Sequence, residues 1–143
     1  MIQPEIMEHA LEIMLEAHKG QRDLDGRAAV LHPLTVGCMG STDEARVTGW
    51  LHDVIEDCEE WTFERLEQEG IPREVVVALQ LLTHDKDVPY IDYVERIATS
   101  GNATAIEVKR NDLTHNLARG KAGGHEQLVA KHSHAMAFFE TRK

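Results

Sequence analysis

Apolar residues recur at intervals of three and four along almost the whole chain, which is the spacing of one face of an α-helix. The first segment shows this at Ile6, Met7, Ala10, Leu11, Met14 and Ala17. A β-strand would need strict alternation, and the β-branched run of residues 75–77 lies inside helical periodicity. The pattern therefore predicts an all-α protein.

Residues that favour helix starts and stops divide this pattern into segments. Proline is suited to the first turn of a helix, and Thr, Asn or Asp side chains cap the preceding position. We expect helices over residues 4–20, from 33, over 43–57, over 62–70, from 72, from 89, over 102–119 and from 125 to the C-terminus. Residues 20–31 carry turn formers and are expected to be a loop.

The length of 143 residues corresponds to one domain, and 42% hydrophobic residues are enough for a core. No repeat, linker or long heptad pattern divides the chain. We therefore expect residues 1–143 to form a single domain.

The net charge restricts the kinds of molecule that the chain can bind. With 15 basic and 25 acidic residues, the net charge is −10, which argues against bulk binding to nucleic acid or to an anionic membrane. A small anionic substrate held by a local basic patch remains compatible with it.

Several features predict a cytoplasmic location. The longest apolar run, residues 75–79, is too short to cross a bilayer, and the N-terminus lacks the pattern of a signal peptide. Cys38 and Cys58 have no metal-ligand spacing and are expected to be buried or partly buried free thiols.

The clearest concentration of chemistry is the run His52, Asp53, Glu56 and Asp57. On one helix these residues are three and four positions apart and would crowd one polar side. Three carboxylates there repel one another unless a cation or a partner offsets them. A solvated acidic face is the ordinary alternative.

Two further places in the sequence favour a cation. His32 precedes Pro33, which disfavours the α conformation and predicts a rigidly placed loop residue ahead of a helix. Asp112 and Asn116 lie four apart on a later helix, where a buried Asp would need a partner. Two imidazoles and two carboxylates, from His32, His52, Asp53 and Asp112, suit Mn²⁺, Fe²⁺, Zn²⁺ or Mg²⁺ with positions open to water.

Four motifs together resemble one family. They are Ala17-His18-Lys19-Gly20-Gln21-Arg22, His32-Pro33-Leu34, Leu51-His52-Asp53-Val54-Ile55-Glu56-Asp57, and Val108-Lys109 with Asp112-Leu113 and Asn116. In order and spacing they resemble the HD superfamily of metal-dependent phosphohydrolases, and in particular the hydrolase domains of RelA/SpoT-type alarmone enzymes and their small single-domain relatives. The resemblance covers about residues 10–120.

This resemblance implies a single helical bundle of the HD-domain type and a set of roles. His32, His52, Asp53 and Asp112 match the metal ligands, usually of Mn²⁺. Glu56 and Asp57 match the acidic pair that orients and activates the attacking water. Asn116 matches a residue of the nucleotide pocket, and Arg22 matches the arginine that packs on guanine. The implied reaction removes pyrophosphate from the 3′ position of guanosine tetra- or pentaphosphate.

The chain departs from the family on the side that would face the substrate. Asp23 stands where a second basic residue is usual, Ala28-Ala29 where Pro-Tyr is usual, and Arg110-Asn111 where Leu-Ala is usual. The metal and water residues are all present. These differences would also suit a relative that acts on another nucleotide.

Among the other residues, Lys19, Lys109 and Arg119 are candidate phosphate contacts. His115 is expected to point away from the site and His132 to lie at the edge of the core, whereas His18 and His84 are expected to be structural.

Three other functions stay open: a nucleotidase or phosphatase on other nucleotides, a metal- or nucleotide-binding sensor without turnover, and a helical interaction domain without metal. A homo-oligomer is also left open.

Overall fold

The computed structural model describes residues 1–140. Its helices are α1 (Pro4–Ala17), α2 (Leu31–Cys38), α3 (Asp43–Leu51), α4 (Val54–Asp57), α5 (Phe63–Gln68), α6 (Arg73–Leu82), α7 (Tyr90–Ala98), α8 (Ala103–Gly123) and α9 (Glu126–Glu140). Within these residues there is no strand, only an isolated bridge between Arg22 and Ala28 in the loop before α2. The prediction of an all-α protein is confirmed. The predicted end of the last helix, at residues 141–143, lies outside the described residues.

Local signals in the sequence set most of the helix starts. Pro4 lies in the first turn of α1, and Pro72 and Pro89 directly precede α6 and α7. The side chains of Thr62 and Asn102 accept hydrogen bonds from backbone N–H groups three residues on, at 3.1 and 2.9 Å. Each of these caps joins residues only three positions apart, so these helix starts could be predicted from the sequence alone.

The single helix predicted over residues 43–57 is wrong, because the structure breaks it after Leu51. The imidazole of His52 donates from Nδ1 to the carbonyl of Gly49, 2.6 Å away, which a continuous helix would pair with the amide of Asp53. From the sequence we expected Asp43 to cap this helix, but the side chain of Thr42 does so by accepting a hydrogen bond from the backbone N–H of Ala45. His52 and Asp53 therefore lie in a turn between α3 and α4.

Three smaller predictions also need correction. His32 lies in the first turn of α2 rather than in the loop. Pro33 is tolerated directly after it, because backbone N–H groups in the first turn of a helix have no partner within the helix. The helix predicted to end near Arg119 runs on to a left-handed Gly124 at φ 71°. Cys38 is exposed at the end of α2, whereas Cys58 is half-buried as predicted.

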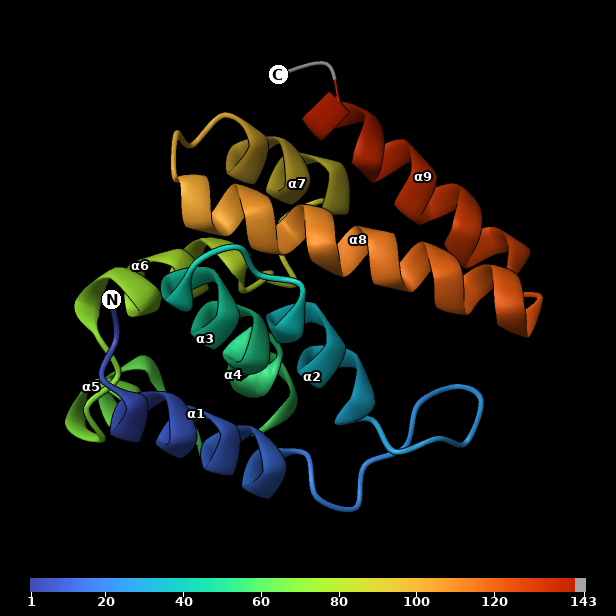
Figure 1. Cartoon of the computed structure of the whole chain (residues 1–143). Helices are drawn as coiled ribbons and strands as arrows, with labels where there is room; N and C mark the ends of the chain where they lie inside the picture. Colours follow the sequence, from blue (N-terminus) through green and yellow to red (C-terminus); the bar gives the residue numbers. More distant parts are fainter. Residues whose placement is uncertain (141–143) are drawn as a thin grey trace.

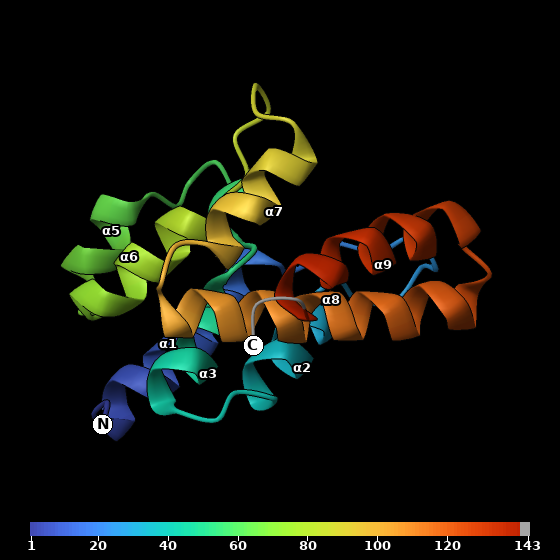
Figure 2. The same cartoon turned by 90° about the horizontal axis from the view of Figure 1, so that it is seen from above.

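Helices α2, α3, α6, α7 and α9 pack against the long helix α8, and α1 and α5 lie farther from it (Figure 1). Helix α9 runs back along α8, as the view from above also shows (Figure 2). One part of the core lies between α1, α3, α5 and α6, and a second lies between α6, α7, α8 and α9. In residues 1–140, no helix has both the length and the apolar character needed to cross a membrane.

Two glycines allow α2 and α3 to pass unusually close to each other. A Cβ atom on Gly49 would lie 2.7 Å from the Cα of Gly37, and one on Gly37 would overlap the ring of Trp50. Larger residues would push these helices apart. The close crossing brings His32 of α2 beside His52 at the end of α3, with 5.3 Å between their ring centroids.

Candidate metal centre

Side chains from α2, the α3–α4 turn and α8 meet at one buried point. His32 Nε2 is 2.7 Å from Asp112 Oδ1, and His52 Nε2 is 3.4 Å from the same oxygen. His52 Nε2 also lies 3.3 Å from Asp53 Oδ2. Donor atoms of His32, His52 and Asp53 lie within 4.8 Å of one another. The four residues are thus brought together from positions up to 80 residues apart.

The imidazole of His52 is held in one orientation. Its Nδ1 donates a hydrogen bond to the carbonyl of Gly49, so Nε2 faces the carboxylates of Asp53 and Asp112. This Nε2 is buried and has no hydrogen bond of good geometry among the described residues. Burial opposes a charge on His52, but the carboxylates of Asp53 and Asp112 outweigh it and raise its pKa to about 9. The centre therefore attracts a cation, either a proton or a metal ion.

Lys109 balances the charge of Asp112 inside the protein. Its Nζ lies 2.9 Å from Asp112 Oδ2, and both side chains are 8% exposed. Burial opposes ionisation of Asp112, but Lys109 and the two imidazoles outweigh it and hold its pKa well below the usual range. Lys109 also lies near the rings of Tyr90 and Tyr93. Lys109 occupies one oxygen of Asp112, and the other oxygen faces the histidines.

His115 is a contact that the sequence interpretation missed. We expected it to point away from the site, but its Nδ1 is 2.7 Å from Nδ1 of His32 and the two rings are stacked. The expectation was wrong because His115 lies one helical turn beyond Asp112, on nearly the same side of α8. The spacing of three residues was the signal in the sequence. This contact orients His32 with Nε2 toward the centre.

The donor set fits a divalent metal ion. Two imidazole nitrogens and carboxylate oxygens converge, and one of the nitrogens is buried without a well-formed hydrogen bond among the described residues. Both histidines are oriented through their other nitrogen. Such a set leaves positions open for water or substrate.

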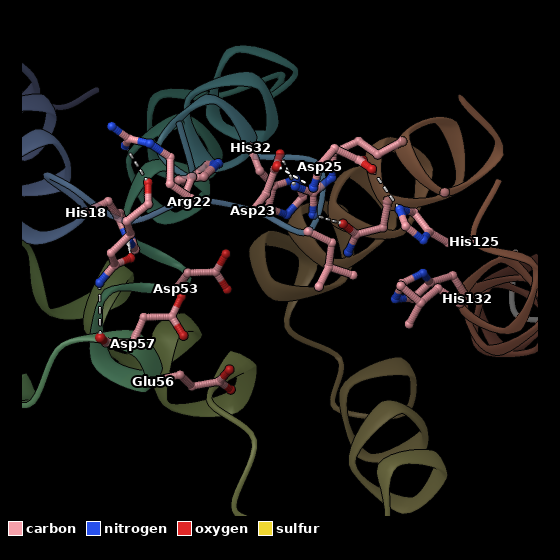
Figure 3. Close-up of a pocket in the computed structure, with 18 residues that line it drawn as sticks. His18, Arg22, Asp23, Asp25, His32, Asp53, Glu56, Asp57, His125 and His132 are labelled. Atoms are coloured by element: carbon pink, nitrogen blue, oxygen red, sulfur yellow. Dashed lines mark hydrogen bonds and ion pairs between the residues drawn. The ribbon is translucent and has the colours of Figure 1, made fainter. Parts of the chain in front are cut away.

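The centre opens onto a cavity of about 820 Å³. Glu56 and Asp57 of α4 line it beside Asp53 (Figure 3). Oε1 of Glu56 accepts a hydrogen bond from the backbone N–H of His84, which fixes its carboxylate. The short helix α4, rather than a continuation of α3, gives these two residues their position.

Both acidic side chains are less acidic than usual. Partial removal from water raises the pKa of Glu56; the N–H of His84 opposes this shift and the charge of Asp53 adds to it. The same loss of hydration and the charge of Asp53 raise the pKa of Asp57. A carboxyl group shifted in this direction exchanges protons more readily near neutral pH.

The predicted substrate contacts fall in three places. Arg22, Asn116 and Arg119 line the large cavity. Lys109 instead lines a separate, smaller cavity of about 180 Å³. Lys19 is exposed and lines neither cavity.

Asn116 connects the centre to the outer part of the large cavity. Its Nδ2 donates to Asp112 Oδ1 at 3.1 Å, and its Oδ1 accepts from the guanidinium of Arg119. A substrate that contacts Asn116 would therefore lie between the centre and Arg119.

Three more histidines line the large cavity, namely His18, His125 and His132. His18 and His132 each keep one buried nitrogen without a hydrogen bond among the described residues. We expected His132 at the edge of the core; it is half-buried and lines the large cavity. The pairing of His125 Nε2 with Asp25 at 2.9 Å joins residues 100 apart, which no local pattern indicates.

Comparison with known proteins gives partial sequence matches. No protein-family model matches the chain. A putative GTP diphosphokinase RSH1, chloroplastic, from Arabidopsis thaliana is 36% identical over 69 residues, which are 46% of this chain and 8% of that protein. The protein of the same name from Oryza sativa subsp. japonica is 37% identical over 75 residues, covering 48% and 8%. The chain spans less than a tenth of the length of these relatives.

A solved structure matches over nearly the whole length. It is described as a metazoan ortholog of SpoT that hydrolyzes ppGpp and plays a role in starvation responses. The TM-score is 0.70 at 19% sequence identity, and the match covers 99% of this chain and 95% of the other. The match shows that the chain shares its helical fold with that structure, as the prediction of a helical bundle requires.

Proposed function

We propose that this protein is a metal-dependent phosphohydrolase of nucleotides. The reaction is 3′-pyrophosphohydrolysis of guanosine tetra- or pentaphosphate or of a related nucleotide. The observation that carries the proposal is Nε2 of His52, which is buried without a well-formed hydrogen bond among the described residues and faces two carboxylates at the base of a nucleotide-sized cavity. The shared fold with a protein described as hydrolysing ppGpp supports it.

In this proposal His32, His52, Asp53 and Asp112 hold one divalent cation, which we take to be Mn²⁺. When bound, the cation supplies Lewis-acid stabilisation to phosphoryl oxygens. The donor set would also accept Fe²⁺, Zn²⁺ or Mg²⁺. His115 orients the ligand His32, and Lys109 balances the charge of the ligand Asp112.

We assign proton transfer to Glu56 and Asp57. One carboxylate accepts a proton from the attacking water, and a carboxyl group returns a proton to the leaving 3′ oxygen. Both groups lie close to Asp53, whose charge raises the pKa of each, and the charge of Asp57 also raises the pKa of Glu56, so we assign the two roles to the pair. Glu56, fixed by the N–H of His84, is well placed to orient water.

Arg22 and Asn116 are the proposed nucleotide contacts. The guanidinium of Arg22 is exposed at the cavity, with Nη1 donating to the carbonyl of Gln21, and its planar face can stack on a base. Stacking on a base far from the reacting phosphorus would stabilise substrate and transition state equally.

The direct test is metal content with turnover. The purified chain is dialysed against Mn²⁺, its bound metal is measured, and phosphate or pyrophosphate release from a panel of nucleotides is followed. We expect one Mn²⁺ per chain and Mn²⁺-dependent release. Asp53→Ala should abolish both.

The matched control is Asp92→Ala, which removes an exposed Asp on α7 away from both cavities. It should keep full metal content and turnover. Full metal content in Asp53→Ala would remove Asp53 from the ligand set, and metal binding without turnover on any nucleotide would favour a sensor module.

A further inference from the structure

The C-terminal end of α1 is tied to the C-terminal end of α4, next to Asp57. His18 is the C-cap residue of α1, and Gln21 follows it by three positions. Sγ of Cys58 donates to the carbonyl of Ala17 at 2.9 Å, and Nε2 of Gln21 donates to the carbonyl of Asp57 at 3.3 Å. These contacts hold His18 and Gln21 against one of the two carboxylates to which proton transfer is assigned.

The hydrogen bonds of Gln21 determine which nitrogen of His18 carries a proton. Nε2 of Gln21 lies 3.3 Å from the carbonyl oxygen of Asp57 and 3.6 Å from Sγ of Cys58, and both atoms accept from it. Oε1 is therefore the amide atom that lies 2.9 Å from Nδ1 of His18. An amide oxygen only accepts, so Nδ1 of His18 is the protonated nitrogen. In the neutral ring, Nε2 is then an acceptor.

This Nε2 of His18 has no donor within the described part of the chain. The residue is only 3% exposed, and its Nε2 is buried without a hydrogen bond among residues 1–140. A buried acceptor of this kind is unfavourable until a donor reaches it. His18 also lines the large cavity, on the same side as Asp57 in Figure 3. The donor therefore has to come from the cavity.

Asp57 is the group at the cavity that can become this donor. An ionised carboxylate only accepts, but a carboxyl group that has taken up a proton has an O–H to donate. Burial and the charge of Asp53 raise the pKa of Asp57 and the charge of His18 opposes them, so His18 and Asp57 act on each other. Glu56, in contrast, is held by the backbone N–H of His84.

We infer that His18 is a positioning residue for Asp57, whose carboxyl group donates to Nε2 of His18 once it holds the proton of the attacking water. One O–H bond of the water breaks as its oxygen attacks phosphorus, and the proton forms the O–H of Asp57. The same proton later goes to the leaving 3′ oxygen, so none is gained or lost. This inference rests on the proposed function and places the proton on Asp57 within the acidic pair.

The first test is His18→Asn, which keeps an amide N–H near the position of Nδ1 and removes Nε2. Metal content and pyrophosphate release from guanosine tetraphosphate are measured on the same samples. We expect normal metal content, wild-type KM and a kcat lower by about three- to tenfold, the contribution of one hydrogen bond. The loss falls on kcat because the bond forms only after the proton has moved. The matched control is His9→Asn, at a half-buried histidine of α1 that lines neither cavity, and it should keep wild-type kcat.

A double-mutant cycle tests whether His18 acts through Asp57. In a chain that carries Asp57→Ala, adding His18→Asn should lower kcat by less than about 1.5-fold, because the group that His18 positions is already gone. Wild-type kcat in His18→Asn overturns the inference. Equal losses with and without Asp57→Ala, or a loss confined to KM or to metal content, also overturn it and make His18 structural.

Nitrogen NMR of the His18 imidazole tests the same contact without turnover. The full chain is used with Mg²⁺, since Mn²⁺ broadens nearby resonances, at a mildly alkaline pH where free imidazole is neutral. Nδ1 should carry the proton, and the Nε2 resonance should move in Asp57→Ala but not in Asp92→Ala. A proton on Nε2, or no response to Asp57→Ala, overturns the inference even where His18→Asn does not fold.

The two kinds of measurement separate this inference from the proposed function. Absence of turnover on every nucleotide of the panel overturns the proposed reaction. The nitrogen resonances then decide on their own whether His18 offers Nε2 to Asp57.

Discussion

The large cavity has a metal end, at His32, His52 and Asp53, and a far end, where Asp25 of the loop before α2 pairs with His125, and the two ends are held together in different ways. At the metal end, His32, His52 and Asp112 are buried and Asp53 is half-buried, and these side chains contact one another at 2.7–3.4 Å. At the far end, loop residues reach α8 and α9 through ion pairs such as Asp25–His125, whose side chains are 39% and 31% exposed. One end depends on packed helices and the other on a loop.

The two ends should therefore differ in how much change they tolerate. A buried network tolerates little change, because removing one partner leaves another charge without compensation. Half-exposed pairs in a loop are weak and can be replaced at small cost. The four proposed metal ligands, which match the motifs of the family, lie at the metal end, whereas Asp23, one of the departures, lies in the loop before α2.

The largest effect on stability is expected from Lys109→Met. It would leave Asp112 buried without its ammonium partner, which typically costs about 3–5 kcal/mol. Urea unfolding of the metal-free protein measures the loss. Lys86→Met, at an exposed lysine, is the control and should change stability little. A loss below about 1 kcal/mol in Lys109→Met would mean that the metal end is not held by this pair.

The next effect is on turnover. Glu56→Gln and Asp57→Asn should keep metal content near normal and lower kcat by at least about tenfold, since general acid–base help is typically worth about 10²–10⁴-fold. Metal analysis and steady-state kinetics are done on the same samples. Loss of metal in both variants would make these residues ligands, and wild-type turnover in both would make them structural.

A smaller effect should follow from His115→Ala. It removes the partner of His32 Nδ1 and should weaken metal affinity by about tenfold, the lower end of what outer contacts contribute. A competition titration with a chelator gives the affinity. His134→Ala, an exposed histidine on α9, serves for comparison. Equal affinities in the two variants would show that His32 does not need this contact.

The smallest effect is expected at the far end. Asp25→Asn breaks a half-exposed ion pair with His125 and should change the free energy of unfolding by less than about 1 kcal/mol. Thermal or urea unfolding checks this. A loss above about 2 kcal/mol, twice the upper value for such pairs, would place the loop within the cooperative core and erase the contrast between the two ends.

The sequence by itself was enough for the all-α architecture, for most helix starts and for the identity of the motif residues. Pro4, Thr62 and Asn102 act on their own next turn of backbone, so their effect does not depend on distant parts of the chain. The pairing of His52-Asp53 with Glu56-Asp57 is likewise a local pattern. The prediction used a continuous helix to bring them together, and the structure uses a turn and a short helix instead.

Only the tertiary structure decided how these residues meet. Leu51 to Val54 contains neither Pro nor Gly, and the break there is held by the His52 ring on Gly49 and by carboxylates that include one from α8. The contact of His115 with His32, and the pairing of Asp25 with His125, join residues 83 and 100 positions apart. Local propensity acts over a few residues, whereas these contacts depend on the crossing of α2 and α3 at Gly37 and Gly49 and on the path of a loop, and both are set by packing between distant segments.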